Sequence, residues 1–119
     1  MFENFNKRIF NIPDDGFGSA SINARIGGDG PPLLLIHGNP LTHASWHKVV
    51  PYLEEKFSLV CVDLRGYGDS IGPEDGGRDS INYSFRAMAM DLVKVMEELG
   101  HPNFFVAGHN RGARTAHRM

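Results

Sequence analysis

The stretch FFVAGHNRGAR, residues 104–114, is an apolar run that leads directly into a glycine-rich turn. Asn110 is the central residue of that turn, with Gly108 two positions before it and Gly112 two positions after it. Turns with this spacing connect a buried strand to a helix and strain the central residue, so that its side chain projects above the sheet. The small residues are needed because strand and helix pack closely there. The spacing therefore predicts a strand, a sharp turn with Asn110 at its apex, and a helix.

Two earlier segments have the composition of strands that are covered on both faces. Leu33–Ile36 is apolar at every position, and Ser58–Val62 is apolar after its first residue. Continuous apolar runs of this kind are typical of strands inside a parallel sheet. Together with Phe104–Ala107, they predict three buried parallel strands.

The N-terminal part of the chain has a different pattern. Lys7–Ile12 and Ser21–Ile26 alternate apolar with polar residues, and residues 13–16 between them, Pro-Asp-Asp-Gly, are turn formers. This arrangement predicts an antiparallel pair of strands before the parallel part of the sheet.

The clearest helix is predicted over Phe85–Leu99, where apolar residues recur at helical spacing. Ser84 is placed to cap its first turn, and Gly100 is a typical stop. Strands that alternate with amphipathic helices indicate an α/β fold, with a mostly parallel sheet and helices on both of its faces.

Two less regular segments lie between these elements. Residues 45–56 have apolar positions on one helical face, and Pro51 is expected to divide them into two short helices. Residues 72–80 are predicted to form a polar loop.

Composition excludes several classes of protein. The 119 residues carry 12 basic and 14 acidic side chains, a net charge of −2, which suits one small domain with no nucleic-acid partner. No apolar run is long enough to span a bilayer and the N-terminus does not resemble a signal peptide, so we expect no membrane association and a cytoplasmic location. Cys61 is the only cysteine and is expected to pack as a small buried apolar residue.

The sequence provides no convincing metal or cofactor site. His43 and His47 are four residues apart, but no third ligand is evident, so we expect both on the surface. Gly66 and Gly68 follow a strand, as in a dinucleotide fingerprint, yet Pro73 and the polar residues beyond it leave no helix to hold a pyrophosphate.

Each predicted parallel strand is followed by a distinctive motif. These motifs are His37-Gly38-Asn39-Pro40, Asp63-Leu64-Arg65-Gly66-Tyr67-Gly68 and the turn around Asn110. With them, and with the stretches Tyr83–Ala89 and Arg111–Arg114, the chain resembles the N-terminal part of an α/β-hydrolase and is most similar to the haloacetate (fluoroacetate) dehalogenases. The resemblance covers roughly residues 20–119, less than half of a family member. It implies that residues 1–119 are an incomplete α/β-hydrolase domain that ends just after the nucleophile elbow, without the cap and the C-terminal half.

The resemblance also implies roles for individual residues. In those enzymes the motif reads Gly-His-Asp-Arg-Gly, and the aspartate attacks the carbon that bears the halogen; Asn110 stands at its position. Arg111 and Arg114 match two arginines that bind the substrate carboxylate, for which a planar guanidinium offers two parallel hydrogen bonds. His37 and Asn39 are expected to line the site, where the backbone supplies an N–H donor.

No metal or organic cofactor is required by that mechanism. The implied partner is a small haloacid, and the full-length protein could form a homodimer.

Three departures keep other interpretations open. The amide of Asn110 is neutral and delocalised, so we expect that the chain as written does not form the ester intermediate. Asn39 replaces the usual phenylalanine and resembles haloalkane dehalogenases, although these usually have tryptophan where Arg111 stands. Epoxide hydrolases use the same elbow, and a non-catalytic binding protein would explain Asn110 directly. Arg114 could also be a solvated helix residue.

Overall fold

The strands of the chain form one five-stranded mixed sheet in the order β1-β2-β4-β3-β5. The structure is a computed structural model that describes residues 5–38, 41–74 and 76–119, with residues 78–80 described by their backbone only. The strands are β1 (Asn6–Ile12), β2 (Ala20–Gly28), β3 (Pro32–Ile36), β4 (Ser58–Val62) and β5 (Phe105–Gly108).

The predicted N-terminal strand pair is confirmed. β1 runs antiparallel to β2, with Phe10 opposite Ile22. β2 also pairs antiparallel with β4, which places Ala24 opposite Val62 and joins the pair to the parallel part of the sheet.

The parallel part of the sheet is centred on β3, which pairs with β4 on one side and β5 on the other. Leu34 and Ile36 face one apolar cluster, whereas Leu33 and Leu35 face a second one on the opposite side of the sheet. β3 is therefore covered on both faces, as its continuous apolar sequence predicts.

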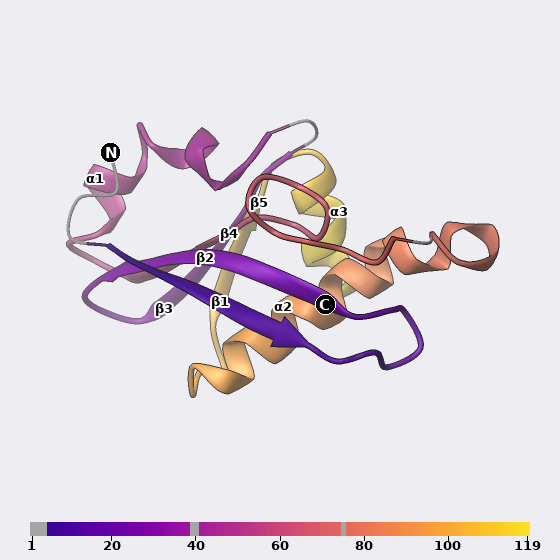
Figure 1. The fold of residues 1–119 in the computed structure, drawn as a ribbon. Coiled ribbons are helices and arrows are strands. Elements are labelled where there is room, and N and C mark those ends of the chain that lie inside the picture. The colour runs from indigo at the N-terminus through magenta and orange to yellow at the C-terminus, as the bar shows by residue number, and fades with distance from the viewer. Residues whose placement is uncertain (1–4, 39–40, 75) are drawn as a thin grey trace.

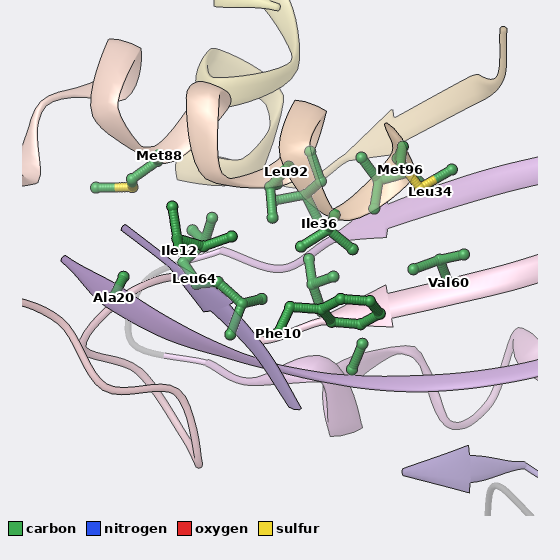
Figure 2. Close-up of a cluster of buried hydrophobic side chains, with 14 residues drawn as sticks. Phe10, Ile12, Ala20, Leu34, Ile36, Val60, Leu64, Met88, Leu92 and Met96 are labelled. Atoms are coloured by element: carbon green, nitrogen blue, oxygen red, sulfur yellow. The ribbon is translucent and has the colours of Figure 1, made fainter. Parts of the chain in front are cut away.

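Helices cover both faces of the sheet, also as predicted (Figure 1). A short 3-10 helix, η1 (His43–Trp46), and α1 (Val50–Leu53) pack on one face, and α2 (Phe85–Glu98) and α3 (Arg111–Arg118) pack on the other. Figure 2 shows Met88, Leu92 and Met96 of α2 against the side chains of the sheet. None of the described helices combines the length and the apolar character needed to cross a membrane.

Two helix predictions require correction. Two short helices form here as expected, η1 and α1, but the break between them lies at residues 47–49; Pro51 lies in the first turn of α1, where its missing N–H costs no hydrogen bond. Residues 78–80 are not loop, because they begin a second 3-10 helix, η2 (Arg78–Tyr83), which leads into α2. By contrast, the Ser84 cap is confirmed: its hydroxyl accepts a hydrogen bond from the Ala87 N–H at 3.1 Å.

The prediction that Phe104–Ala107 is a buried strand is wrong for its centre. β5 begins at Phe105 and lies at the edge of the described sheet, where it pairs with β3 alone. Phe105 is 61% exposed and Val106 is 39% exposed. Their apolar sequence is that of an interior strand, but the Phe105 ring makes only an edge-to-face contact with Phe57, at 6.1 Å between ring centroids, and remains largely exposed.

Candidate active site

The turn between β5 and α3 has the geometry that its sequence predicts. Asn110 lies between the last residue of β5 and the first residue of α3, with φ 56° and ψ −114°. In the described part of the chain it is the one residue other than glycine with a positive φ. Its side chain is exposed at the apex of the turn. The backbone is therefore strained at Asn110, the expected nucleophile position, as in a nucleophile elbow.

Gly108 and Gly112 permit the close contact on which this turn depends. A Cβ on Gly108 would lie 2.4 Å from the carbonyl oxygen of Gly112, and a Cβ on Gly112 would lie 2.2 Å from that of Ile36. The His109 N–H also donates to the Ile36 carbonyl at 3.0 Å. The elbow is thus held directly against the end of β3.

His37 is placed beside the elbow, but its ring bonds to the backbone. Its Nε2 accepts a hydrogen bond from the Leu64 N–H at 2.9 Å, so Nδ1 carries the proton and donates to the Gly38 carbonyl at 2.8 Å. Burial is the main reason that the pKa of His37 is lowered, which favours this neutral ring. Any contact of His37 with a substrate would therefore come from its backbone. Asn39 lies outside the described residues.

Arg111 and Arg114 lie close together on the first turn of α3. Their Cζ atoms are 5.2 Å and 5.9 Å from the centroid of the Phe85 ring at the start of α2. Arg111 is half-buried and Arg114 is exposed, and within the described residues neither forms an ion pair with a carboxylate. A cavity of about 400 Å³ adjoins Phe85 and Arg114. The two arginines thus form a positive site immediately after the elbow, and no carboxylate of the described side chains neutralises it.

Residues 31–119 match the family described as the alpha/beta hydrolase fold. The chain belongs to this family. The matched residues include the elbow, the end of β3 beside it and both arginines.

Individual relatives of this α/β hydrolase include two types of enzyme. The chain is 47% identical over 119 residues to the fluoroacetate dehalogenase of Burkholderia sp, covering 100% of this chain and 37% of that protein. It is 38% identical over 89 residues to the soluble epoxide hydrolase of Corynebacterium sp. (strain C12), covering 75% of this chain and 29% of that protein. Among solved structures, a protein from Nostoc sp PCC 7120 described as an α/β hydrolase aligns with a TM-score of 0.90 and 50% identity, over 99% of this chain and 38% of that chain. The chain therefore spans well under half the length of these relatives.

Asp63 organises the segment that follows β4 in this α/β hydrolase. Its buried carboxylate accepts hydrogen bonds from the backbone N–H and Nδ1 of His43 at 2.7 Å and 2.8 Å, from Asn23 Nδ2 at 2.9 Å and from the Asp69 N–H at 3.1 Å. Burial alone would raise the pKa of Asp63, but these hydrogen bonds outweigh it and hold the pKa well below its usual range. The prediction that His43 lies on the surface is therefore wrong, because its side chain is only 12% exposed; His47 is exposed as expected.

Arg65 is a buried residue whose role the sequence analysis did not identify. Its guanidinium pairs with Asp91 of α2 and also donates to the carbonyl oxygens of Phe17 at 2.6 Å and Asn82 at 2.7 Å. One side chain thus ties the β1–β2 loop, η2 and α2 to the segment after β4. A signal was present in the sequence: Asp91 lies on the apolar face of α2, between Met88 and Val95.

Proposed function

We propose that this site belongs to a hydrolase of the haloacetate dehalogenase type, which removes halide from short 2-haloacids. The observation that carries this proposal is the pair of arginines, Arg111 and Arg114, directly after the strained elbow at Asn110, with no ion-pair partner among the described side chains. The 47% identity to a fluoroacetate dehalogenase supports the same substrate class.

In this reaction, position 110 must supply a nucleophile. A carboxylate oxygen there would form a bond to the carbon that bears the halogen, and the halide would leave with the bonding electrons. Water would then hydrolyse the ester and release a hydroxyacid. The strained backbone at position 110 presents the side chain for such an attack. The Asn110 amide lacks the negative charge of a carboxylate, so the chain as written would bind a haloacid without forming the ester.

Arg111 and Arg114 would bind the substrate carboxylate. Two guanidinium groups can neutralise the anion and fix its orientation through paired hydrogen bonds. Their positions one and four residues after Asn110 would place the carboxylate near the attacking atom, and they would favour haloacids over neutral haloalkanes.

The experiment compares the full-length protein with its Asn110→Asp variant, by measuring halide release from chloroacetate and from 1-chlorobutane. We expect the Asn110 protein to release none, and Asn110→Asp to release chloride from chloroacetate only. Turnover by Asn110 protein that is free of the deamidated form would contradict the role assigned to the amide. No halide release from chloroacetate by a folded Asn110→Asp variant would contradict the dehalogenase assignment, and if the variant also hydrolysed no epoxide, the result would indicate a non-catalytic binding protein.

Epoxide hydrolysis is the second candidate. It is favoured by the 38% identity to a soluble epoxide hydrolase, because ring opening would use a nucleophile at the same elbow. Diol formation from a neutral epoxide by Asn110→Asp, without halide release from chloroacetate, would support this candidate instead.

A further inference from the structure

The ring of Phe85 is the surface that Arg111 and Arg114 share. Both Cζ atoms, at 5.2 Å and 5.9 Å from the ring centroid, lie within the distance of about 6 Å at which a guanidinium is attracted to an aromatic face. Within the part of the chain that the structure describes, neither guanidinium forms an ion pair with a carboxylate. The aromatic ring is therefore the identified contact that orients both groups.

The position of this ring is fixed by the packing of two helices. Phe85 is the first residue of α2, directly after the Ser84 cap, and α2 packs against α3 through Thr115 and Met88, whose Oγ1 and Sδ atoms are 3.9 Å apart. Thr115 and Met88 are both buried, so the two helices are in direct contact through their interior faces. The ring and the arginines are consequently carried by two helices that pack against each other.

Such a ring addresses two difficulties of a binding site made from adjacent arginines. Two positive charges on one helical turn repel each other, and the negative face of an aromatic ring offsets part of this repulsion. An arginine also loses rotamer freedom when it binds an anion, and a side chain that is already held over a ring loses less.

We propose that Phe85 is a positioning residue that holds Arg111 and Arg114 ready to receive a carboxylate. This inference rests on the proposed function, because it assumes that the two arginines bind the substrate anion. Phe85 itself makes no hydrogen bond to that anion; its effect on affinity acts through the two guanidinium groups.

The test measures binding of fluoroacetate and of neutral fluoroacetamide to the full-length Asn110 protein by ¹⁹F NMR. We expect Phe85→Leu to weaken fluoroacetate binding about tenfold, since the arginines must then be ordered by the ligand, and to leave fluoroacetamide binding unchanged. Phe85→Tyr keeps an aromatic face and should restore the affinity. The matched control is Phe17→Leu. Phe17 lies in the β1–β2 loop, and its ring centroid is 6.0 Å from Cζ of Arg86, so this variant removes a similar contact elsewhere and should change neither affinity.

The outcomes separate this inference from the proposed function. If Arg111→Gln and Arg114→Gln bind fluoroacetate as well as the unmodified protein, the proposed function fails and this inference fails with it. If they bind weakly but Phe85→Leu binds normally, the role of Phe85 is overturned and the proposed function stands.

A second measurement needs no substitution and applies even if Phe85→Leu does not fold. In the unmodified protein, the Nε–Hε groups of Arg111 and Arg114 should be more ordered in ¹⁵N relaxation than that of the exposed Arg118. Equal mobility of the three groups would overturn the inference.

Discussion

Arg65 and Asp91 form a two-point ion pair inside the protein. Arg65 Nε donates to Oδ2 of Asp91 and Arg65 Nη2 donates to Oδ1, both at 2.6 Å. Each side chain is only 2% exposed. Because Arg65 also donates to the Phe17 and Asn82 carbonyl oxygens, the pair holds the β1–β2 loop and η2 against α2. The ion pair therefore has a structural role, because it connects the segment that follows β4 to α2 and to both neighbouring segments.

Removing one partner of this pair should be costly. Arg65→Met leaves the Asp91 carboxylate buried without a counter-charge, and we expect it to lower the free energy of unfolding by about 4 kcal/mol. The measurement is urea unfolding of the full-length protein and the variant, monitored by circular dichroism.

The double variant Arg65→Met/Asp91→Leu provides the control. It removes both charges, so we expect it to recover part of the loss but not all of it, because the Phe17 and Asn82 carbonyl oxygens still lose their donor. A double variant that is less stable than Arg65→Met would show that the uncompensated charge is not the main cost.

The elements of the fold could be predicted wherever the pattern is local. Ser58–Val62 has the bounds of β4, and Phe85–Leu99 differs from α2 by one residue, because apolar runs and helical periodicity are read directly along the chain. Residues 78–83 have no such periodicity, so the 3-10 helix there was not predicted. The exposure of Phe105 does not follow from its local apolar run, because it depends on which strands lie beside it in space.

The same distinction applies to the site. The elbow at Asn110 follows from the spacing of two glycines over five residues, which is a local signal. The pairing of Arg65 with Asp91 joins residues 26 positions apart, and its bond to Phe17 spans 48 positions. The contact of Phe85 with two arginines on another helix also depends on tertiary packing. No local pattern specifies such partners.

The lowered pKa of Asp63 predicts a loss of stability in acid. The unfolded chain binds a proton to this carboxylate at a higher pH than the folded chain does, so its contribution is complete above the ordinary aspartate pKa of about 4 and decreases as the pH falls below it. We expect Asp63→Asn to lower the free energy of unfolding by about 2 kcal/mol at pH 7. The NH2 group of the new amide would face N–H groups that donate to the carboxylate in the unmodified protein, so at least one of these hydrogen bonds would be lost. This difference should shrink at pH 3, as urea titrations at both pH values would show.

Asp69→Asn is the matched control for this experiment. The Asp69 side chain is 59% exposed and 3.4 Å from Lys7, so its loss should cost less than about 1 kcal/mol at either pH. A cost for Asp63→Asn that does not change between pH 7 and pH 3 would contradict the pKa assignment.

Gly112 should tolerate no side chain. A Cβ there would lie 2.2 Å and 2.6 Å from the carbonyl oxygens of Ile36 and His37, which are backbone atoms at the end of β3. We expect Gly112→Ala to lower the free energy of unfolding by about 3 kcal/mol, because α3 must move away from the sheet.

The control for this prediction is Gly100→Ala, at the end of α2. Gly100 has φ +82° and open space around it, so the substitution adds backbone strain of about 1 kcal/mol and no collision. If thermal unfolding shows the same loss for Gly100→Ala and Gly112→Ala, the close contact of elbow and strand is not what requires glycine at position 112.

The strained backbone of Asn110 predicts a substitution that stabilises the protein. Its φ of 56° and ψ of −114° are readily adopted by glycine, and strain of this kind costs about 1–3 kcal/mol. We expect Asn110→Gly to raise the free energy of unfolding by about 1 kcal/mol, since the greater freedom of glycine in the unfolded chain offsets part of the gain.

Asn103→Gly makes the same replacement at an exposed loop position without a positive φ, and should be neutral or destabilising. Equal losses for the two variants in urea unfolding would show that the elbow stores no strain. A gain for Asn110→Gly alone would show that stability is sacrificed to present the side chain at position 110.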